Sequence, residues 1–368
     1  MKINILIPHK EKFDIEKLSS VSITIINNFN FSQFQENIKI FGKKVKNPAK
    51  PDNFIGIKNS FNILKSKNKH LAEKMLNHIK NDNEKKQLIE IHNRPILLGY
   101  IFKKIGTKFP IIIFFHNNPL DMRGSKTLQE RKQIVQKASV ILCVSKFIKN
   151  KFLAGFDYEP KNVHVLYNGV DRTIKKFPKK INEVLYVGRI VHEKGVHIFI
   201  NSVEKLIGTF PSWKFCIVGS SHLGEYKEKS NFSNFYINKF LQIGKQAYFT
   251  GYISHEEVQN KMREAAIVVV PSIWEEPFGL VVAEAMSNGA AIITTNMGGI
   301  PEIVGENGIL IKDINEEKLI NALRSLMTDK KKLKNFQELS WKNFNQTGLK
   351  SSRKLDLIRI ETLKGFYF

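Results

Sequence analysis

Short apolar runs alternate with helix-like stretches along the chain, and this alternation limits the possible folds more than any other feature. In the first half, the apolar runs that fit strands are residues 3–7, 38–41, 88–91, 110–115, 139–144 and 163–166. Stretches with helical spacing lie between them, among them residues 69–79, 95–105 and 127–137. Such alternation predicts βαβ units, in which parallel strands form a sheet covered by helices.

The pattern breaks once and then starts again. A polar stretch over residues 168–180 contains the turn signal Asn168-Gly169 and also Pro178, which indicates a domain boundary. A second series of strand-like runs follows at residues 184–187, 214–218, 248–250, 267–270, 290–294 and 308–311. A helix capped by Asn315 is expected at residues 315–327, and an amphipathic helix at residues 351–363.

These patterns predict an α/β fold with two Rossmann-like domains, residues 1–177 and residues 178–345, followed by a helical tail at residues 346–368. We expect the tail to cross back to the N-terminal domain. Two doubly wound domains leave a central cleft at the carboxyl ends of their strands, which is where such sheets bind ligands.

Composition excludes several classes of protein. The chain has 368 residues and no apolar run of 18 or more, so no membrane-spanning helix is expected. The apolar run at the start is too short for a signal peptide and fits a buried strand. Cys143 and Cys216 lie inside strand-like runs, which favours buried thiols over a disulfide or a metal site. This pattern fits a reducing compartment, so we expect a cytoplasmic protein.

The positive charge is concentrated in the first half. Residues 1–175 contain 32 Lys and Arg against 14 Asp and Glu, which accounts for +18 of the net charge of +24. A lysine- and asparagine-rich composition from an A/T-rich genome would explain this, and so would attraction to a membrane face, a phosphorylated glycolipid or nucleic acid. No aromatic-interleaved basic motif, zinc-ligand spacing or recognition helix supports nucleic-acid binding.

The most informative segment is residues 268–286, VVVPSIWEEPFGLVVAEAM. A buried strand is expected to end at Pro271, and a helix to begin near Phe278-Gly279-Leu280. The first turn of a helix has free N–H groups and the positive end of the helix dipole, which suit a phosphate. Glu284 lies in an otherwise apolar helix, where a carboxylate is costly unless it accepts strong hydrogen bonds, for example from ribose hydroxyls.

A second cluster follows the first strand of the second half. In the sequence GRIVHEKG, Arg189 and Lys194 come directly after a predicted strand that ends at Gly188. Arg189 offers a planar fork for phosphate oxygens, and Lys194 offers a mobile point charge. We therefore expect both cations to reach one phosphate group outside the strand end. A solvated basic loop is the alternative interpretation.

Together these motifs resemble family 4 of the retaining glycosyltransferases with the GT-B fold. The resemblance rests on Arg189 with Lys194-Gly195, on residues 276–284, and on the sequence GGIPE at residues 298–302. It extends to the interdomain segment NGVD at residues 168–171 and to Cys143-Val144-Ser145. His116 matches the position of the family's cleft histidine. The second half matches more closely than the first.

The resemblance implies a role for each matching residue. Arg189 and Lys194 would hold the donor diphosphate and stabilise its charge as the sugar leaves. Glu276 would bind sugar hydroxyls, Glu284 would bind the ribose, and His116 would lie beside the donor sugar. Phe278, Gly279 and Leu280 would present the start of their helix to the phosphate and the sugar.

The implied reaction moves a sugar from a UDP- or GDP-linked donor to a cell-envelope glycan or glycolipid, of the lipopolysaccharide type. The family needs no metal, and the chain has no D-x-D motif for a metal-bound diphosphate. No other cofactor is expected, and the nucleotide sugar acts as co-substrate. The basic first half suggests peripheral docking on the inner face of the membrane. His92 and Asn93 are weaker candidates for contact with the acceptor.

Other functions remain open on the same architecture. A nucleotide-sugar epimerase is the main alternative, whereas a Rossmann dehydrogenase is disfavoured because no G-x-G-x-x-G follows the first strand of either half. The chain also departs from the family in the loop after its first strand, where family members often have glycines. The nearest small residues here are Ser19, Ser20 and Ser22, and the β-branched stretch after them makes a helix there uncertain.

Overall fold

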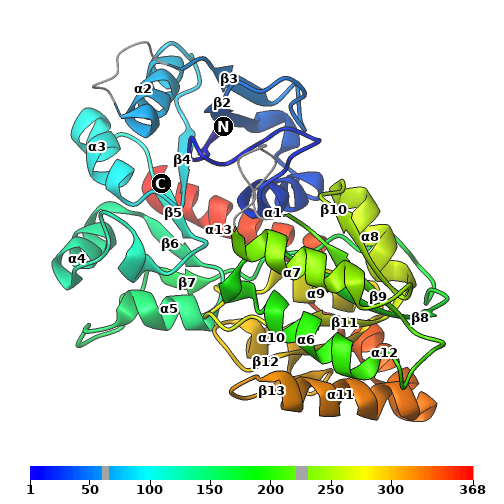
Figure 1. Ribbon diagram of the computed structural model, residues 1–368. Coiled ribbons are helices and arrows are strands. Elements are labelled where there is room, and N and C mark those ends of the chain that lie inside the picture. The colour runs from blue at the N-terminus through cyan, green and yellow to red at the C-terminus, as the bar shows by residue number, and fades with distance from the viewer. Residues whose placement is uncertain (60–65, 221–230, 368) are drawn as a thin grey trace. The chain divides into compact units, whose positions relative to one another are not determined.

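The computed structural model of the chain describes residues 1–59, 66–220 and 231–367 (Figure 1). Two units are present, one formed by Met1–Gly169 with Gly348–Phe368 and the other by Val170–Thr347. Each unit contains one parallel sheet covered by helices. The predicted α/β fold with two Rossmann-like domains is confirmed.

The first unit has a seven-stranded parallel sheet in the order β3-β2-β1-β4-β5-β6-β7. Its strands are β1 Lys2–Leu6, β2 Ile38–Lys43, β3 Phe54–Ile57, β4 Gln87–His92, β5 Ile111–Phe115, β6 Val140–Cys143 and β7 Val163–Val165. Its helices are α1 Ser20–Asn30, α2 Lys67–Lys80, α3 Ile96–Ile105, α4 Leu128–Lys137, α5 Lys146–Leu153 and α13 Gly348–Tyr367, with short 3-10 helices η1 Gln35–Asn37 and η2 Pro119–Asp121. The strand order reverses between β1 and β4, which places their carboxyl ends at a topological switch point.

The second unit has a six-stranded parallel sheet in the order β10-β9-β8-β11-β12-β13. Its strands are β8 Ile181–Val187, β9 Lys214–Val218, β10 Ala247–Gly251, β11 Ala265–Val270, β12 Ala291–Thr295 and β13 Ile309–Ile311. Its helices are α6 Val196–Leu206, α7 Asn231–Gln242, α8 His255–Glu264, α9 Leu280–Ser287, α10 Ile300–Val304, α11 Glu316–Thr328 and α12 Lys330–Asn343, with the 3-10 helix η3 His192–Lys194. Here the order reverses between β8 and β11, the two strands that precede the predicted donor-site loops.

One strand was not predicted from the sequence, and one helix was uncertain. Strand β3 was not predicted, because its four residues are interrupted by Gly56 and only Ile57 is buried. Helix α1 forms despite its β-branched residues, because Ser19 caps it by accepting a hydrogen bond from the Ser22 N–H at 3.2 Å. Its residues Val21, Ile25 and Phe29 recur at intervals of four and are buried along one face.

Helix α13 belongs to the first unit, where it packs on α1 (Figure 1). Its Arg359 is 2% exposed and forms two hydrogen bonds with the Glu90 carboxylate of β4, at 2.7 and 2.9 Å. Asp356 accepts a third from Arg359 at 3.0 Å and one from Ser32 at 2.8 Å. Glu90, Asp356 and Arg359 therefore each have a charged partner, which offsets the cost of removing these charges from water.

The units divide eight residues before the predicted boundary at residue 177. The guanidinium of Arg172 lies over the Trp341 ring, 4.0 Å from its centroid, and donates to the Trp341 carbonyl at 2.7 Å. The segment that follows Gly169 is therefore packed into the second unit and is not a free linker. At the other end, the tail joins the first unit from Gly348 rather than from residue 346.

Candidate active site

The loops that follow β8 and β11 meet in the second unit. The Ile273 N–H donates to the Glu193 carbonyl at 3.0 Å, and the Ser272 hydroxyl donates to the same carbonyl at 3.2 Å. At this junction Lys194 Nζ lies 2.5 Å from Glu276 Oε1, which also accepts a hydrogen bond from Ser272 at 2.9 Å. Two residues that are 82 positions apart in the sequence thus form one ion pair.

A third loop fixes the backbone of Glu276. The Gly299 N–H donates to the Glu276 carbonyl at 2.7 Å. The preceding residue, Gly298, has a φ of +61° and lies so close that a Cβ there would be 2.2 Å from the Glu276 oxygen. The two glycines of the GGIPE motif therefore allow the loop after β12 to support the loop that carries Glu276.

Helix α9 begins at Leu280, close to the predicted start. Gly279 caps it in the left-handed conformation, with a φ of 95°, and Phe278 is buried at 3% exposure. Leu280 is partly exposed at the first position of the helix. The amino-terminal end of α9 therefore directly follows the loop in which Glu276 is paired with Lys194.

Glu284 is buried at 4% exposure, as its apolar surroundings in the sequence indicate, and its partner is a residue that the sequence did not reveal. His255 Nε2, at the start of α8, lies 2.7 Å from Glu284 Oε1. Burial opposes the charged form of His255, but the hydrogen bond with Glu284 and its negative charge outweigh burial and raise the pKa of His255. The sequence shows the Ser254–Glu257 capping box beside this histidine, but no local pattern links His255 to α9.

Arg189 has a different partner from Lys194. It lies directly after β8, but its guanidinium is 3.5 Å from Glu193 Oε1, and both side chains are more than 40% exposed. The structure thus brings Lys194 to Glu276 and leaves Arg189 in a weak surface pair with Glu193. Such exposed pairs contribute little to stability, so little free energy is lost when Arg189 turns to another anion.

The predicted histidine lies in the first unit, at the carboxyl end of β5. His116 Nε2 is 2.9 Å from Nδ1 of His92, which ends β4, and the two rings stack with an interplanar angle of 16°. The His92 ring also stacks on Phe114, with centroids 4.1 Å apart. Only one of the two facing nitrogens can carry the proton of this hydrogen bond, so each ring fixes the tautomer of the other.

Burial keeps this histidine pair neutral. It lowers the pKa of His116 to about 4 and that of His92 well below its usual value of 6.5, and the neighbouring His116 and Arg359 charges add to the effect on His92. Neutral rings at neutral pH suit His116 for hydrogen bonding rather than for carrying a fixed positive charge.

The comparisons with known proteins agree with these two units. The family model "Glycosyl transferases group 1" matches residues 169–341, and the model "Glycosyltransferase Family 4" matches residues 47–173. The glycosyltransferase YtcC of Bacillus subtilis is 25% identical over 66% of this chain and 64% of its own length. The lipopolysaccharide 1,2-N-acetylglucosaminetransferase of Salmonella typhimurium is 29% identical over 44% of this chain and 46% of its own. The chain thus spans less than two thirds of these curated relatives.

Among solved structures, HepE of Anabaena in complex with UDP and glucose superimposes with a TM-score of 0.76. The sequence identity is 18%, and the alignment covers 98% of this chain and 99% of HepE, so the likeness concerns the fold. The match over residues 169–341 falls on the second unit, the match over residues 47–173 falls almost entirely on the first, and both relatives are named as sugar transferases. The chain belongs to the glycosyltransferases of the GT-B fold, and its second unit is a domain of glycosyl transferases group 1.

Proposed function

We propose that the protein is a retaining glycosyltransferase that moves a sugar from a nucleoside diphosphate to a glycan or glycolipid acceptor. The observation that carries this proposal is the 2.5 Å ion pair between Lys194 and Glu276. It joins a cation suited to phosphate and an acid suited to sugar hydroxyls just before the amino-terminal end of α9. A diphosphate sugar needs both kinds of group side by side.

The chemistry of the transfer explains why these groups are needed. When the glycosyl–phosphate bond breaks, negative charge develops on the departing diphosphate and positive charge on the sugar ring. Lys194, Arg189 and the first amides of α9 would stabilise the diphosphate, and Glu276 would hold the sugar. Lys194 would exchange part of its contact with Glu276 for the phosphate, while Arg189 would leave its surface pair with Glu193.

Glu284 would bind the ribose through the oxygen that His255 does not occupy. His116 would lie beside the donor sugar, where its neutral ring would hydrogen bond with a hydroxyl. We further propose that no metal takes part, because two cations and a helix terminus supply positive charge at the diphosphate. UDP is the first nucleotide to test, since HepE was crystallised with it.

The acceptor is proposed to be a cell-surface glycan or glycolipid, and the similarity to a lipopolysaccharide sugar transferase supports this class. No helix within the described residues is long and apolar enough to cross a bilayer. We propose a cytoplasmic protein that docks peripherally on the membrane through its basic first unit. Flotation with anionic liposomes tests the docking, and co-migration that salt does not weaken, or no co-migration at all, contradicts it.

The transfer itself is tested in two steps. Thermal shift with a panel of UDP and GDP sugars identifies the donor, because a ligand at 100 times its dissociation constant stabilises the fold by about 2.7 kcal/mol. Glu276→Ala and Arg189→Ala should then abolish transfer while the protein stays folded. Glu306→Ala and Arg324→Ala remove the same charges from exposed positions and should leave transfer unchanged. Wild-type turnover in both site variants, or epimerisation of the donor without an acceptor, would refute the proposal.

A further inference from the structure

A cavity of about 430 Å³ lies in the first unit, between the start of α2, the start of α3 and the end of η2. Its charged lining residues are Lys69, Arg94, Arg123 and Asp121, and Asn93 forms part of its wall. We call this cavity the basic pocket. Its volume falls within the range of about 300–1,000 Å³ that is usual for small-molecule sites, and three of its four charges are positive.

Asn93 connects the basic pocket to the histidine pair. It is buried at 1% exposure and has a φ of 55°, a left-handed conformation that residues other than glycine adopt only uncommonly. Its side-chain oxygen accepts a hydrogen bond from the His116 N–H at 3.2 Å. Its carbonyl accepts one from Arg94 Nη1 at 2.7 Å. The turn at Asn93 thus places a cation of the pocket next to the loop of His116.

The basic residues of the pocket are available to a ligand. Within residues 1–59, 66–220 and 231–367, no carboxylate lies within 4 Å of the charged groups of Lys69, Arg94 or Arg123. Glu11 interacts electrostatically with Arg94, and burial raises the pKa of Glu11, but Glu11 does not line the pocket. Asp121 is exposed and is the one acid among the lining residues, so the lining carries a net positive charge.

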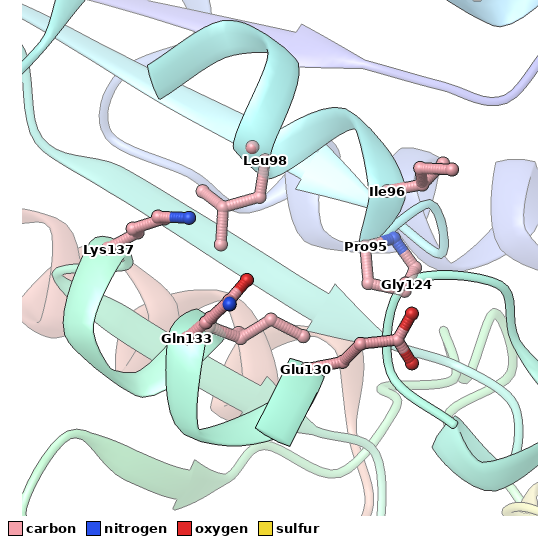
Figure 2. A pocket seen from close by; sticks show the side chains of 9 residues that line it. Pro95, Ile96, Leu98, Gly124, Glu130, Gln133 and Lys137 are labelled. Carbon is pink, nitrogen blue, oxygen red and sulfur yellow. The ribbon is translucent and has the colours of Figure 1, made fainter. Parts of the chain in front are cut away.

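A second cavity, of about 200 Å³, shares Pro95 and Ile96 with the basic pocket and continues between α3 and α4. Figure 2 shows Leu98 of α3 on one side and Gln133 and Lys137 of α4 on the other. This lining mixes apolar and polar groups, with Glu130 balancing Lys137. The two cavities together offer a charged compartment and a less charged one, which suits a sugar that carries an anionic group.

We propose that the basic pocket binds the acceptor through a phosphate or carboxylate group carried on a sugar. This inference rests on the proposed transfer function and specifies its acceptor as anionic. Arg94 and Arg123 supply the guanidinium forks that match phosphate and carboxylate geometry, and Lys69 adds a point charge. The neighbouring His116 loop then lies beside the sugar that carries the anion.

The test measures binding of glucose 6-phosphate, glucuronate, glucose and inorganic phosphate to the full-length protein by ligand-observed NMR. The variants are Arg94→Gln and Arg123→Gln, and the matched control is Lys103→Gln, an exposed basic residue of α3 that lies outside both cavities. Arg123 is exposed, so its replacement should leave the fold intact. UDP binding is measured on every protein, because the predicted nucleotide site lies in the other unit.

We expect at least one anionic sugar to bind at least tenfold more tightly than glucose. Each arginine variant should weaken that binding about five- to tenfold, and Lys103→Gln should leave it unchanged. Equal binding of glucose, tighter binding of free phosphate than of either anionic sugar, or unchanged binding in both arginine variants would overturn the inference. If UDP still binds in those cases, only the acceptor assignment fails. If UDP and nucleotide sugars do not bind, the transfer function itself fails.

Discussion

The support that the GGIPE loop gives to Glu276 can be tested by adding a single methyl group. In Gly298→Ala, the new Cβ would lie 2.2 Å from the Glu276 carbonyl oxygen and 2.6 Å from its nitrogen. Both neighbours are backbone atoms, so no side-chain rotation relieves the overlap. To reach even about 3.2 Å, the Glu276 backbone has to move by roughly 1 Å.

Two effects follow from that change. The left-handed conformation of residue 298 costs about 1–2 kcal/mol for alanine, which should lower the free energy of unfolding. The 1 Å displacement also shifts the Glu276 carboxylate relative to Lys194. A misplacement of this size in a catalytic site costs about 100-fold in rate, so we expect kcat for sugar transfer to fall by about that factor.

Gly305→Ala is the matched control. Gly305 also has a positive φ, of +50°, but nothing lies within 4 Å of the position of its Cβ. This variant should lose similar stability in urea unfolding and keep its turnover. The reasoning is refuted if Gly298→Ala keeps kcat within about threefold of wild type, or if Gly305→Ala loses as much activity.

Three further predictions concern buried charges. Arg359→Ala leaves Glu90 buried without its partner and should lower the free energy of unfolding by about 3–5 kcal/mol in urea titrations, whereas a loss below 1 kcal/mol would contradict the buried pairing. Because the pKa of His116 is about 4 in the folded state and 6.5 without burial, the unfolded state binds more protons between these values. Stability should therefore fall as the pH drops from 6.5 to 4, by up to roughly 3 kcal/mol, and less steeply in His116→Asn. The pKa of His255 is raised, so its effect on stability has the opposite pH dependence. Its pairing with Glu284 stabilises the fold fully below pH 6.5, and this stabilisation is lost as the pH rises through the folded-state pKa. The stability difference between wild type and His255→Gln should shrink from pH 6 to pH 9 in urea unfolding, and a difference that stays constant would argue against the pair.

Most strands and helices could be predicted from the sequence, because the patterns that indicate them are local. Strands such as β9, Lys214–Val218, were predicted with their exact ends, since an apolar run bounded by polar residues needs no tertiary information. Ser145 and Asn315 cap their helices as predicted, because capping depends on residues only three positions away. Both cysteines are buried thiols for the same reason: the apolar runs that contain them form interior strands, paired on both sides.

Contacts between distant segments were harder to predict. The proximity of Lys194 and Glu276 was anticipated only because their motifs resemble a known family. The His255–Glu284 and His92–His116 pairs lie 29 and 24 residues apart and have no periodic signal. The pairing of Arg189 with Glu193 was not predicted, because nothing in the sequence separates a neighbouring glutamate from a ligand as its partner. Side-chain partners across loops depend on packing, which a linear pattern does not contain.

The position of α13 has a consequence for the order in which a growing chain can mature. Glu90 lies on the central strand of its sheet, and the ribosome adds Arg359 some 270 residues after it. Until then the nascent first unit holds a carboxylate without its cation, while all of Val170–Thr347 has already emerged. The unit that begins at Val170 can therefore complete its core first, and the unit that contains Glu90 has to wait for α13.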